Sequence, residues 1–309
     1  MRTIVIDRAQ DGKRLDRVIR DSFRQMPQSA LYKAFRKRDI KVNGIRVKED
    51  HVVNEGDRVD IYIIDDILEG TPIDTGSLTH GFTIVYEDAN LLIVNKNQGI
   101  PVHPDREQRT NTLIDLVQRY LVEKGEYIPD APGSFPPSLC HRLDRNTGGL
   151  LIIAKNNWSL EILLEKIKNK EIHKYYQCLV MGCMEQKQAE LRAFLEKDEY
   201  KSRVFVKDTG SNGALEIITR YRMLEYSDDV SRLEVELVTG RTHQIRAHLA
   251  YIGHPVVGDG KYGSNTFNRS KNAKYQMLWA YKLAFDFQTS AGALSYLKGR
   301  TFQVDPEFI

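Results

Sequence analysis

At 309 residues with a net charge of only +3, the chain is longer than one ordinary hydrophobic core requires. We therefore expect two domains, or one large domain with an added module. Hydrophobic residues make up 41% and charged residues 28%, and no stretch of apolar residues is long enough to predict a membrane-spanning helix. The chain starts without the apolar run of a signal peptide, and its three cysteines form no CxxC pair, so we expect a cytoplasmic protein without disulfides or a zinc site.

The first 64 residues carry the excess of positive charge. They hold fifteen Lys and Arg against ten Asp and Glu, whereas the rest of the chain has two more acidic than basic residues. Apolar spacing predicts one helix over 14–24 and a second, with a basic polar face, from Leu31 onward. The pair Asn43-Gly44 predicts a hairpin turn, and Arg58–Ile64 predicts a strand. Such a basic module fits a polyanionic partner as readily as a well-solvated surface.

Residues 65–81 are rich in acidic, Gly, Ser and Thr residues, which predicts a linker between a module at 1–64 and a second domain at 82–309. The second domain contains two amphipathic helices, around Leu113–Tyr120 and Leu160–Ile167. Strands are predicted at Phe82–Tyr86, Leu91–Asn95, Leu150–Ala154, Tyr176–Val180, Ala214–Tyr221 and Leu233–Val238. Because strands and helices do not alternate regularly, the pattern predicts an α+β fold with a mixed, largely antiparallel sheet.

Three polar segments lie beside predicted strands or helices and are candidates for chemistry. Cys140–Gly149 runs into a buried strand, Val238–Leu249 turns at a glycine into a helix, and Gly253–Gly263 is a glycine-rich loop. Loops held on rigid elements commonly carry reactive groups. Asp144 in the first segment could equally belong to a surface ion pair, which would contribute little.

The residues argue against several kinds of site. His243 and His248 are five positions apart rather than the four that a helical zinc pair needs, and Gly253–Gly263 lacks the phosphate-binding pattern GxxxxGK[ST]. No GxSxG elbow or thiol–histidine signature of a hydrolase is present. We therefore expect no metal and no cofactor. What remains is a carboxylate, several arginines and a basic module, a combination compatible with RNA chemistry.

Four motifs in chain order resemble those of the RluA-type pseudouridine synthases. The segment 141–151 (HRLDRNTGGLL) resembles the signature HRLDxxTSGLLL, and 240–249 followed by 252–259 resembles the second large motif of the family. The segment Asn95–Pro104 is similar to the element NKPxGxxVHP, and 173–176 is similar to the KxY element. The N-terminal module is similar to the RNA-binding domain first described in small-subunit ribosomal protein S-four. The resemblance thus covers nearly the whole chain.

Two positions depart from the family pattern. Gly148 stands where the family has a serine, so a hydroxyl contact is missing, and we expect a small structural effect. Asn97 replaces the proline that follows Asn95-Lys96, which loosens one turn away from Asp144.

The resemblance implies the pseudouridine synthase fold and an isomerase that converts uridine in RNA to pseudouridine. Asp144 would be the catalytic carboxylate, either as a nucleophile on sugar carbon 1′ or as a base at the sugar, and both roles stay open. Arg246 would be the partner that favours the ionised carboxylate. Tyr176 would stack on the uracil and assist proton removal from carbon 5, unless it is a strand tyrosine whose ring lies in the core. Arg142 would fill the space left by the flipped base, or hold phosphate.

The resemblance also implies RNA as the partner of a monomeric enzyme, most simply large-subunit ribosomal RNA during ribosome biogenesis. Transfer RNA remains the alternative substrate. A non-catalytic RNA-binding assembly factor would have no reason to keep Asp144, Tyr176 and Arg246 together, and a glycosidic hydrolase would need a second carboxylate. The N-terminal residues expected to contact RNA are Lys33, Arg36, Lys37, Arg38 and Lys41.

Overall fold

The computed structural model describes residues 2–23, 28–62, 81–105, 108–129, 131, 133–198, 203–210 and 213–308; for 28–30, 32 and 33 it describes the backbone alone. The chain divides into two compact units, Met1–Ser77 and Leu78–Ile309, each with its own hydrophobic core. The linker predicted at 65–81 lies outside the described residues except for Gly81. No helix in the described ranges combines the length and the apolar character that crossing a membrane requires.

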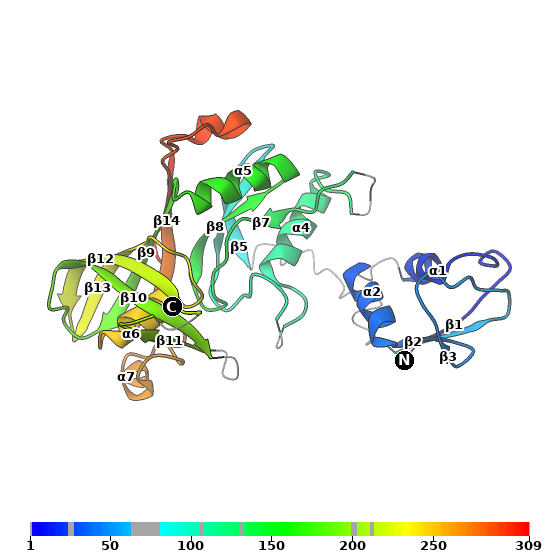
Figure 1. The fold of residues 1–309 in the computed structure, drawn as a ribbon, viewed down its shortest axis with the longest axis horizontal. Helices are drawn as coiled ribbons and strands as arrows, with labels where there is room; N and C mark the ends of the chain where they lie inside the picture. The colour runs from blue at the N-terminus through cyan, green and yellow to red at the C-terminus, as the bar shows by residue number, and fades with distance from the viewer. Residues whose placement is uncertain are drawn as a thin grey trace. The chain divides into compact units, whose positions relative to one another are not determined.

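The N-terminal unit is a four-stranded antiparallel sheet with two helices, drawn in blue in Figure 1. The strand order is β1 (Arg2–Val5), β4 (Arg58–Ile61), β2 (Ile40–Val42) and β3 (Ile45–Arg46), and the helices are α1 (Leu15–Ser22) and α2 (Gln28–Lys37). The predicted hairpin is confirmed: Val42 pairs with Ile45, and Asn43 and Gly44 between them have φ of 50° and 80°. Apolar residues of both helices and of β2 and β4 form one core. The sequence did not predict β1, whose four residues are mostly exposed.

The larger unit is built on an eleven-stranded sheet within the described residues. Its order is β11-β10-β12-β13-β9-β14-β8-β6-β5, with β15 beside β14 and β7 beside β8 (Figure 1). The pairing of β14 with β8 is parallel and the other described pairings are antiparallel, so the predicted mixed, largely antiparallel α+β architecture is confirmed. The strands are β5 (Phe82–Glu87), β6 (Leu91–Lys96), β7 (Ser138–Leu139), β8 (Gly148–Ala154), β9 (Ile172–Met181), β10 (Gln188–Asp198), β11 (Arg203–Lys207), β12 (Leu215–Ser227), β13 (Val230–Leu237), β14 (Leu278–Phe285) and β15 (Thr301–Gln303).

The helices of this unit begin with side-chain caps where the sequence supplies them. Thr112 and Asp115 form a capping box at the start of α4 (Leu113–Glu123), and the Asn156 side chain accepts the Ser159 amide at the start of α5 (Asn157–Lys168). Both helices were predicted. The remaining helices are α6 (Gln244–Tyr251), α7 (Asn265–Ser270) and the 3₁₀ helix η1 (Gly292–Leu297).

Strand β8 is the rigid support of the site. All seven of its residues are buried: Leu151 and Ile153 belong to one hydrophobic cluster, and Leu150 and Ile152 belong to another. Because side chains alternate along a strand, these two clusters lie on opposite faces of the sheet. The loop that runs into β8 is therefore attached to a strand that is packed on both sides.

The first residue of β8 explains one departure from the family pattern. Gly148 pairs with Trp279 of β14, and a Cβ atom at position 148 would lie 2.4 Å from the indole ring. The Trp279 side chain is fully buried, so the ring has little room to move. Glycine at this position therefore makes room for a tryptophan. The small effect expected from the missing serine hydroxyl stays a prediction.

Candidate active site

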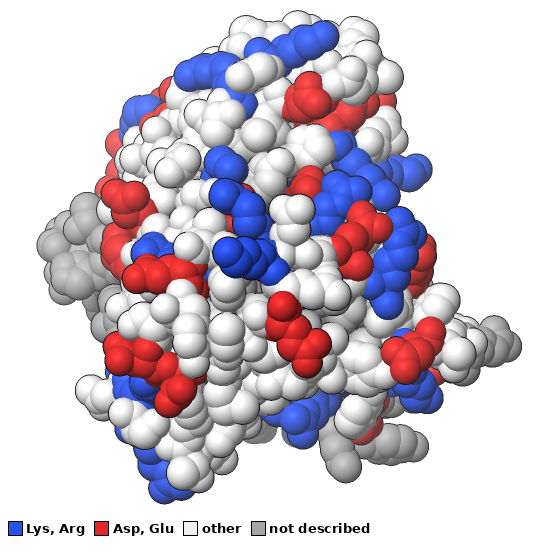
Figure 2. Space-filling model, turned by 90° about the vertical axis from the view of Figure 1, so that its left-hand side faces the viewer, with Lys and Arg blue, Asp and Glu red and all other residues white. Residues whose placement is uncertain are grey.

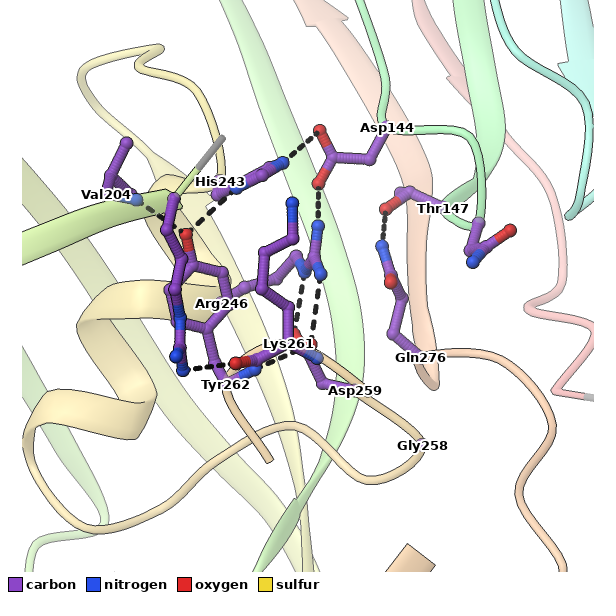
Figure 3. A network of polar contacts seen from close by, with 12 residues as sticks. Asp144, Thr147, Val204, His243, Arg246, Gly258, Asp259, Lys261, Tyr262 and Gln276 are labelled. Carbon is purple, nitrogen blue, oxygen red and sulfur yellow. Dashed lines mark hydrogen bonds and ion pairs between the residues drawn. The ribbon is translucent and has the colours of Figure 1, made fainter. Parts of the chain in front are cut away.

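The segments 140–149 and 238–249 frame one cleft of about 900 Å³, and β9 supplies a third side. Asp144 enters the cleft from the first segment, Arg246 from the second and Tyr176 from β9. The glycine-rich loop 253–263 contacts Arg246 of the second segment through Asp259 and Tyr262 (Figure 3). The structure therefore brings together three segments that are far apart in the sequence.

Arg246 holds the carboxylate of Asp144. Its Nη1 donates a hydrogen bond of 2.6 Å to Asp144 Oδ2 (Figure 3). The Arg246 side chain is almost completely buried, whereas that of Asp144 keeps 27% of its surface exposed. Helix α6 is anchored to the sheet by Gln244, whose amide donates to the Ile218 carbonyl and the Thr219 hydroxyl. A fixed cation thus faces a carboxylate that a ligand can still reach.

Asp259 fixes the other side of the same guanidinium, and sequence reasoning missed it. Arg246 Nε and Nη2 donate to the two oxygens of Asp259 at 2.7 and 3.0 Å, in a bidentate pair that is buried. The amides of Lys261 and Tyr262 also donate to Asp259. Burial by itself raises the pKa of Asp259, but the bonds and charge of Arg246 outweigh it and hold that pKa below its usual value. Asp259 therefore orients Arg246 so that Nη1 points at Asp144.

His243 is a second neighbour of Asp144 that was not assigned a role from the sequence. Its backbone has φ of 53° at the start of α6, which turns the imidazole toward the cleft. The ring lies between two groups, with Nε2 3.9 Å from Asp144 Oδ1 and Nδ1 2.9 Å from the Tyr262 hydroxyl. That hydroxyl accepts the Val204 amide, so its own proton is available to Nδ1. Burial lowers the pKa of His243, and the charge of Asp144 opposes this shift.

Tyr176 lines the cleft and also packs in the core. Only 4% of the residue is exposed, and it belongs to the hydrophobic cluster that includes Leu143 and Ile245. Burial raises its pKa, and the negative charge of Asp144 raises it further, so the phenol is neutral at physiological pH. Tyr176 thus packs in the core and also lines the cleft, and its stacking on uracil stays a prediction.

The loop that carries Asp144 is held by a buried lysine. Lys96 ends β6 with no exposed surface, and its Nζ donates to the carbonyls of Asn97, Ile100 and Arg145 at 2.8, 2.9 and 2.9 Å. Burial lowers the pKa of Lys96 to about 7, and the charge of Asp144 opposes that shift. A lysine at the end of an otherwise apolar run was the available sequence signal for such a clamp.

The other predicted residues are placed as follows. Arg142 is exposed and lines the cleft next to His141. In the N-terminal unit, the predicted residues Arg36, Lys37 and Arg38 are exposed, and Lys41 lies with its Nζ 5.0 Å from the centre of the Tyr62 ring. The side chain of Lys33 lies outside the described residues.

The site thus combines a reachable carboxylate, an arginine that orients it and a buried tyrosine, an arrangement that is compatible with carboxylate chemistry. The family model described as RNA pseudouridylate synthase matches residues 90–251, and the chain belongs to this family of RNA-acting isomerases.

Two similar relatives are bacterial. The chain is 33% identical over 273 residues to "Ribosomal large subunit pseudouridine synthase C" of Vibrio cholerae, with 86% of this chain and 81% of the relative covered. It is 30% identical over 255 residues to "Ribosomal large subunit pseudouridine synthase D" of Xylella fastidiosa, with 82% and 72% covered. The solved structure of human RNA pseudouridylate synthase domain containing 4 shares the fold, with a TM-score of 0.58 at 20% identity over 75% of this chain and 90% of that chain.

Proposed function

We propose that this protein converts specific uridines of large-subunit ribosomal RNA to pseudouridine, with Asp144 as the catalytic carboxylate. The observation that carries the proposal is the Asp144 carboxylate, held by Arg246 at 2.6 Å and still reachable from the cleft. The ribosomal substrate is supported by the names of the two bacterial relatives. An enzyme with this substrate works where ribosomes assemble, which in a bacterium is the cytoplasm.

The reaction breaks the bond between uracil nitrogen 1 and the sugar, turns the base and rejoins it through carbon 5. The target nucleotide leaves its stack first, because the scissile bond is inaccessible in paired RNA. Asp144 then attacks carbon 1′ or takes a proton from the sugar, and both roles fit its exposure. Tyr176 supports the uracil ring and assists removal of the carbon 5 proton after the new bond forms, while nitrogen 1, freed from the sugar, takes up a proton from water. Arg142, exposed at the edge of the cleft, contacts the RNA from which the base has turned out.

The N-terminal unit is proposed to be an S-four-like RNA-binding domain that acts in a monomeric enzyme. Its helices and small sheet form a separate core, which fits a module that contributes affinity rather than chemistry. The exposed side chains of Arg36, Lys37 and Arg38 follow one another at the end of α2, where they can neutralise phosphates. Lys33 and Lys41 are proposed to extend this contact.

The test is to replace Asp144 with Asn and to map pseudouridine in large-subunit ribosomal RNA and in transfer RNA. Cells without the gene should lack one or more pseudouridines in ribosomal RNA, and the wild-type gene should restore them. Asp144→Asn should not restore them, and its rate in vitro should fall by roughly 10³-fold or more, with RNA binding retained.

Asp305→Asn is the matched control, since Asp305 is exposed and lies outside the cleft. It should behave as the wild type. Retained turnover in Asp144→Asn would rule out the proposed chemistry. Loss of pseudouridine from transfer RNA alone would keep the chemistry and change the substrate.

A further inference from the structure

Lys174 is one of several basic residues that line the cleft containing Asp144, and the chemistry above does not use it. Lys174 and Tyr176 are two residues apart on β9, so their side chains project from the same face of the sheet. Both line the cleft. Two residues advance a strand by roughly 7 Å, a spacing comparable with that between the base of a nucleotide and its phosphate.

Among the described residues, Lys174 has no anionic partner of the kind that Arg220 and Arg222 of β12 have. Arg220 Nη1 lies 3.3 Å from Glu236 Oε2, and Arg222 Nη2 lies 3.0 Å from Glu234 Oε1. Figure 2 likewise shows acidic and basic side chains interspersed on the face that it views. Within the part of the chain that the structure describes, the Lys174 side chain forms no ion pair and donates no hydrogen bond. Its charge is therefore available to a ligand.

The ammonium of Lys174 lies between the two loops that frame the cleft. A Cβ atom at Gly240 would be 3.7 Å from Lys174 Nζ, so the ammonium faces the turn before α6. On the other side it acts on His141: burial, and after it the charge of Lys174, lower the pKa of that histidine to about 3. His141 is thus neutral at physiological pH. Burial also lowers the pKa of Lys174, as expected for a cation without a counter-ion.

A cation that is held on a rigid strand and has no partner in an accessible cleft suits an anion, because an anion would compensate the cost of its partial burial. Arg241, next to Gly240, also lines the cleft and is exposed. The anion nearest to a uracil that is supported by Tyr176 is a phosphodiester of the same strand. We propose that Lys174, with Arg241 beside it, binds the RNA phosphate adjacent to the target uridine; this rests on the proposed function only in taking RNA as the ligand.

The test measures binding of a nine-residue oligouridylate to the full-length protein by fluorescence anisotropy over a series of KCl concentrations. Lys174→Gln should weaken binding by roughly tenfold at low salt. It should also reduce the slope of log K against log [KCl] by about 0.7, the value for one lost phosphate contact with a single strand. Lys174→Arg should retain the slope, since the site needs a cation and not a titrating amine.

Lys298→Gln is the matched control, because Lys298 is exposed on the same unit and lies outside the cleft. It should leave both the affinity and the slope unchanged. Lys174→Gln should unfold at the wild-type temperature or above it, because the change removes a partly buried unpaired charge.

Two outcomes would overturn the proposal. One is an unchanged salt slope in Lys174→Gln, and the other is weaker binding accompanied by a lower unfolding temperature, which would make Lys174 a structural residue. The oligouridylate assay does not depend on the natural target. A wild-type protein that leaves ribosomal RNA unmodified would refute the proposed function, while a slope reduced in Lys174→Gln would still support the phosphate site.

Discussion

Two carboxylates share the guanidinium of Arg246, and they have different exposures. Asp259 is buried and binds Nε and Nη2, whereas Asp144 is partly exposed and receives only Nη1. The buried pair sets the direction of the arginine, and the arginine sets the direction of the reactive carboxylate. A planar guanidinium suits this task because its donors have a fixed geometry, which a lysine ammonium lacks.

At the residue scale, Asp259→Asn should impair both stability and turnover. Breaking a buried ion pair leaves the Arg246 charge poorly compensated, so the free energy of unfolding should fall by about 3–5 kcal/mol. The turnover number should fall more than the affinity for RNA, because Arg246 no longer holds Asp144 in place. Urea unfolding and steady-state kinetics measure the two effects. If both stayed at wild-type values, the orienting role of Asp259 would be wrong.

The same residue predicts an acid limit to stability. The pKa of Asp259 is lowered in the folded state, so its contribution is present above the unfolded pKa of about 4. The contribution is lost as the pH falls through the folded value, where Asp259 takes up a proton. The unfolding temperature of the wild type should therefore decrease when the pH is lowered below about 4. The fall should be shallower in Asp259→Asn, which has no carboxylate to protonate at this position.

At the element scale, the parallel contact between β8 and β14 controls where the Asp144 loop ends. Gly148 lies against Trp279, and Gly149, with φ of 115°, has the backbone oxygen of Ala280 2.3 Å from the position of a Cβ. No other residue fits at Gly149 without moving a strand. Two consecutive glycines thus let β14 approach β8 directly beside the loop that carries Asp144.

Gly148→Ser should destabilise the protein through overpacking, by about 1–3 kcal/mol. The double variant Gly148→Ser/Trp279→Leu should lose less stability than the sum of the two single losses, because both changes alter the same contact. Thermal unfolding of the single and double variants measures this coupling. Gly260→Ser serves as the control, because a Cβ there meets no atom within 4 Å. Strict additivity would mean that Trp279 does not determine which residue position 148 accepts.

Strands were predicted correctly where the apolar runs are long. They were missed where pairing with distant strands determines that a segment is a strand. The buried strands β6 and β8 were predicted nearly residue for residue, because their runs are apolar and bounded by polar residues. Strand β10 was missed, since many of its residues are exposed or charged and its support comes from β11 and β12. Strand β14 was missed because a short apolar run fits a helix as well as a strand.

At the scale of the whole molecule, the chain has two units with separate cores. The cleft that contains Asp144 is built from residues of Leu78–Ile309, whereas the basic end of α2 belongs to Met1–Ser77. If the N-terminal unit binds RNA as proposed, it raises the local concentration of RNA at that cleft.

Deletion of residues 1–77 should leave a folded catalytic unit with weaker and less salt-dependent RNA binding. The slope of log K against log [KCl] should fall by about 0.7 for each lost phosphate contact. Circular dichroism of residues 78–309 should show a cooperative unfolding transition, because the unit has its own hydrophobic clusters. An unchanged affinity and salt slope would remove RNA binding from the N-terminal unit.

The sequence by itself determined the secondary structure of the apolar segments, the loop before β8 and the choice of Asp144, because these depend on local periodicity and motif. The resemblance also assigned Arg246 as the partner of Asp144, although the two residues are 102 positions apart. Only the tertiary structure showed that Asp259 and His243 meet at the same place. Partners so distant are selected by the packing of α6 and the 253–263 loop against the sheet. The fold likewise determines whether Lys174 has an anionic partner, because the residues beside it come from distant parts of the sequence. A local sequence pattern does not predict this.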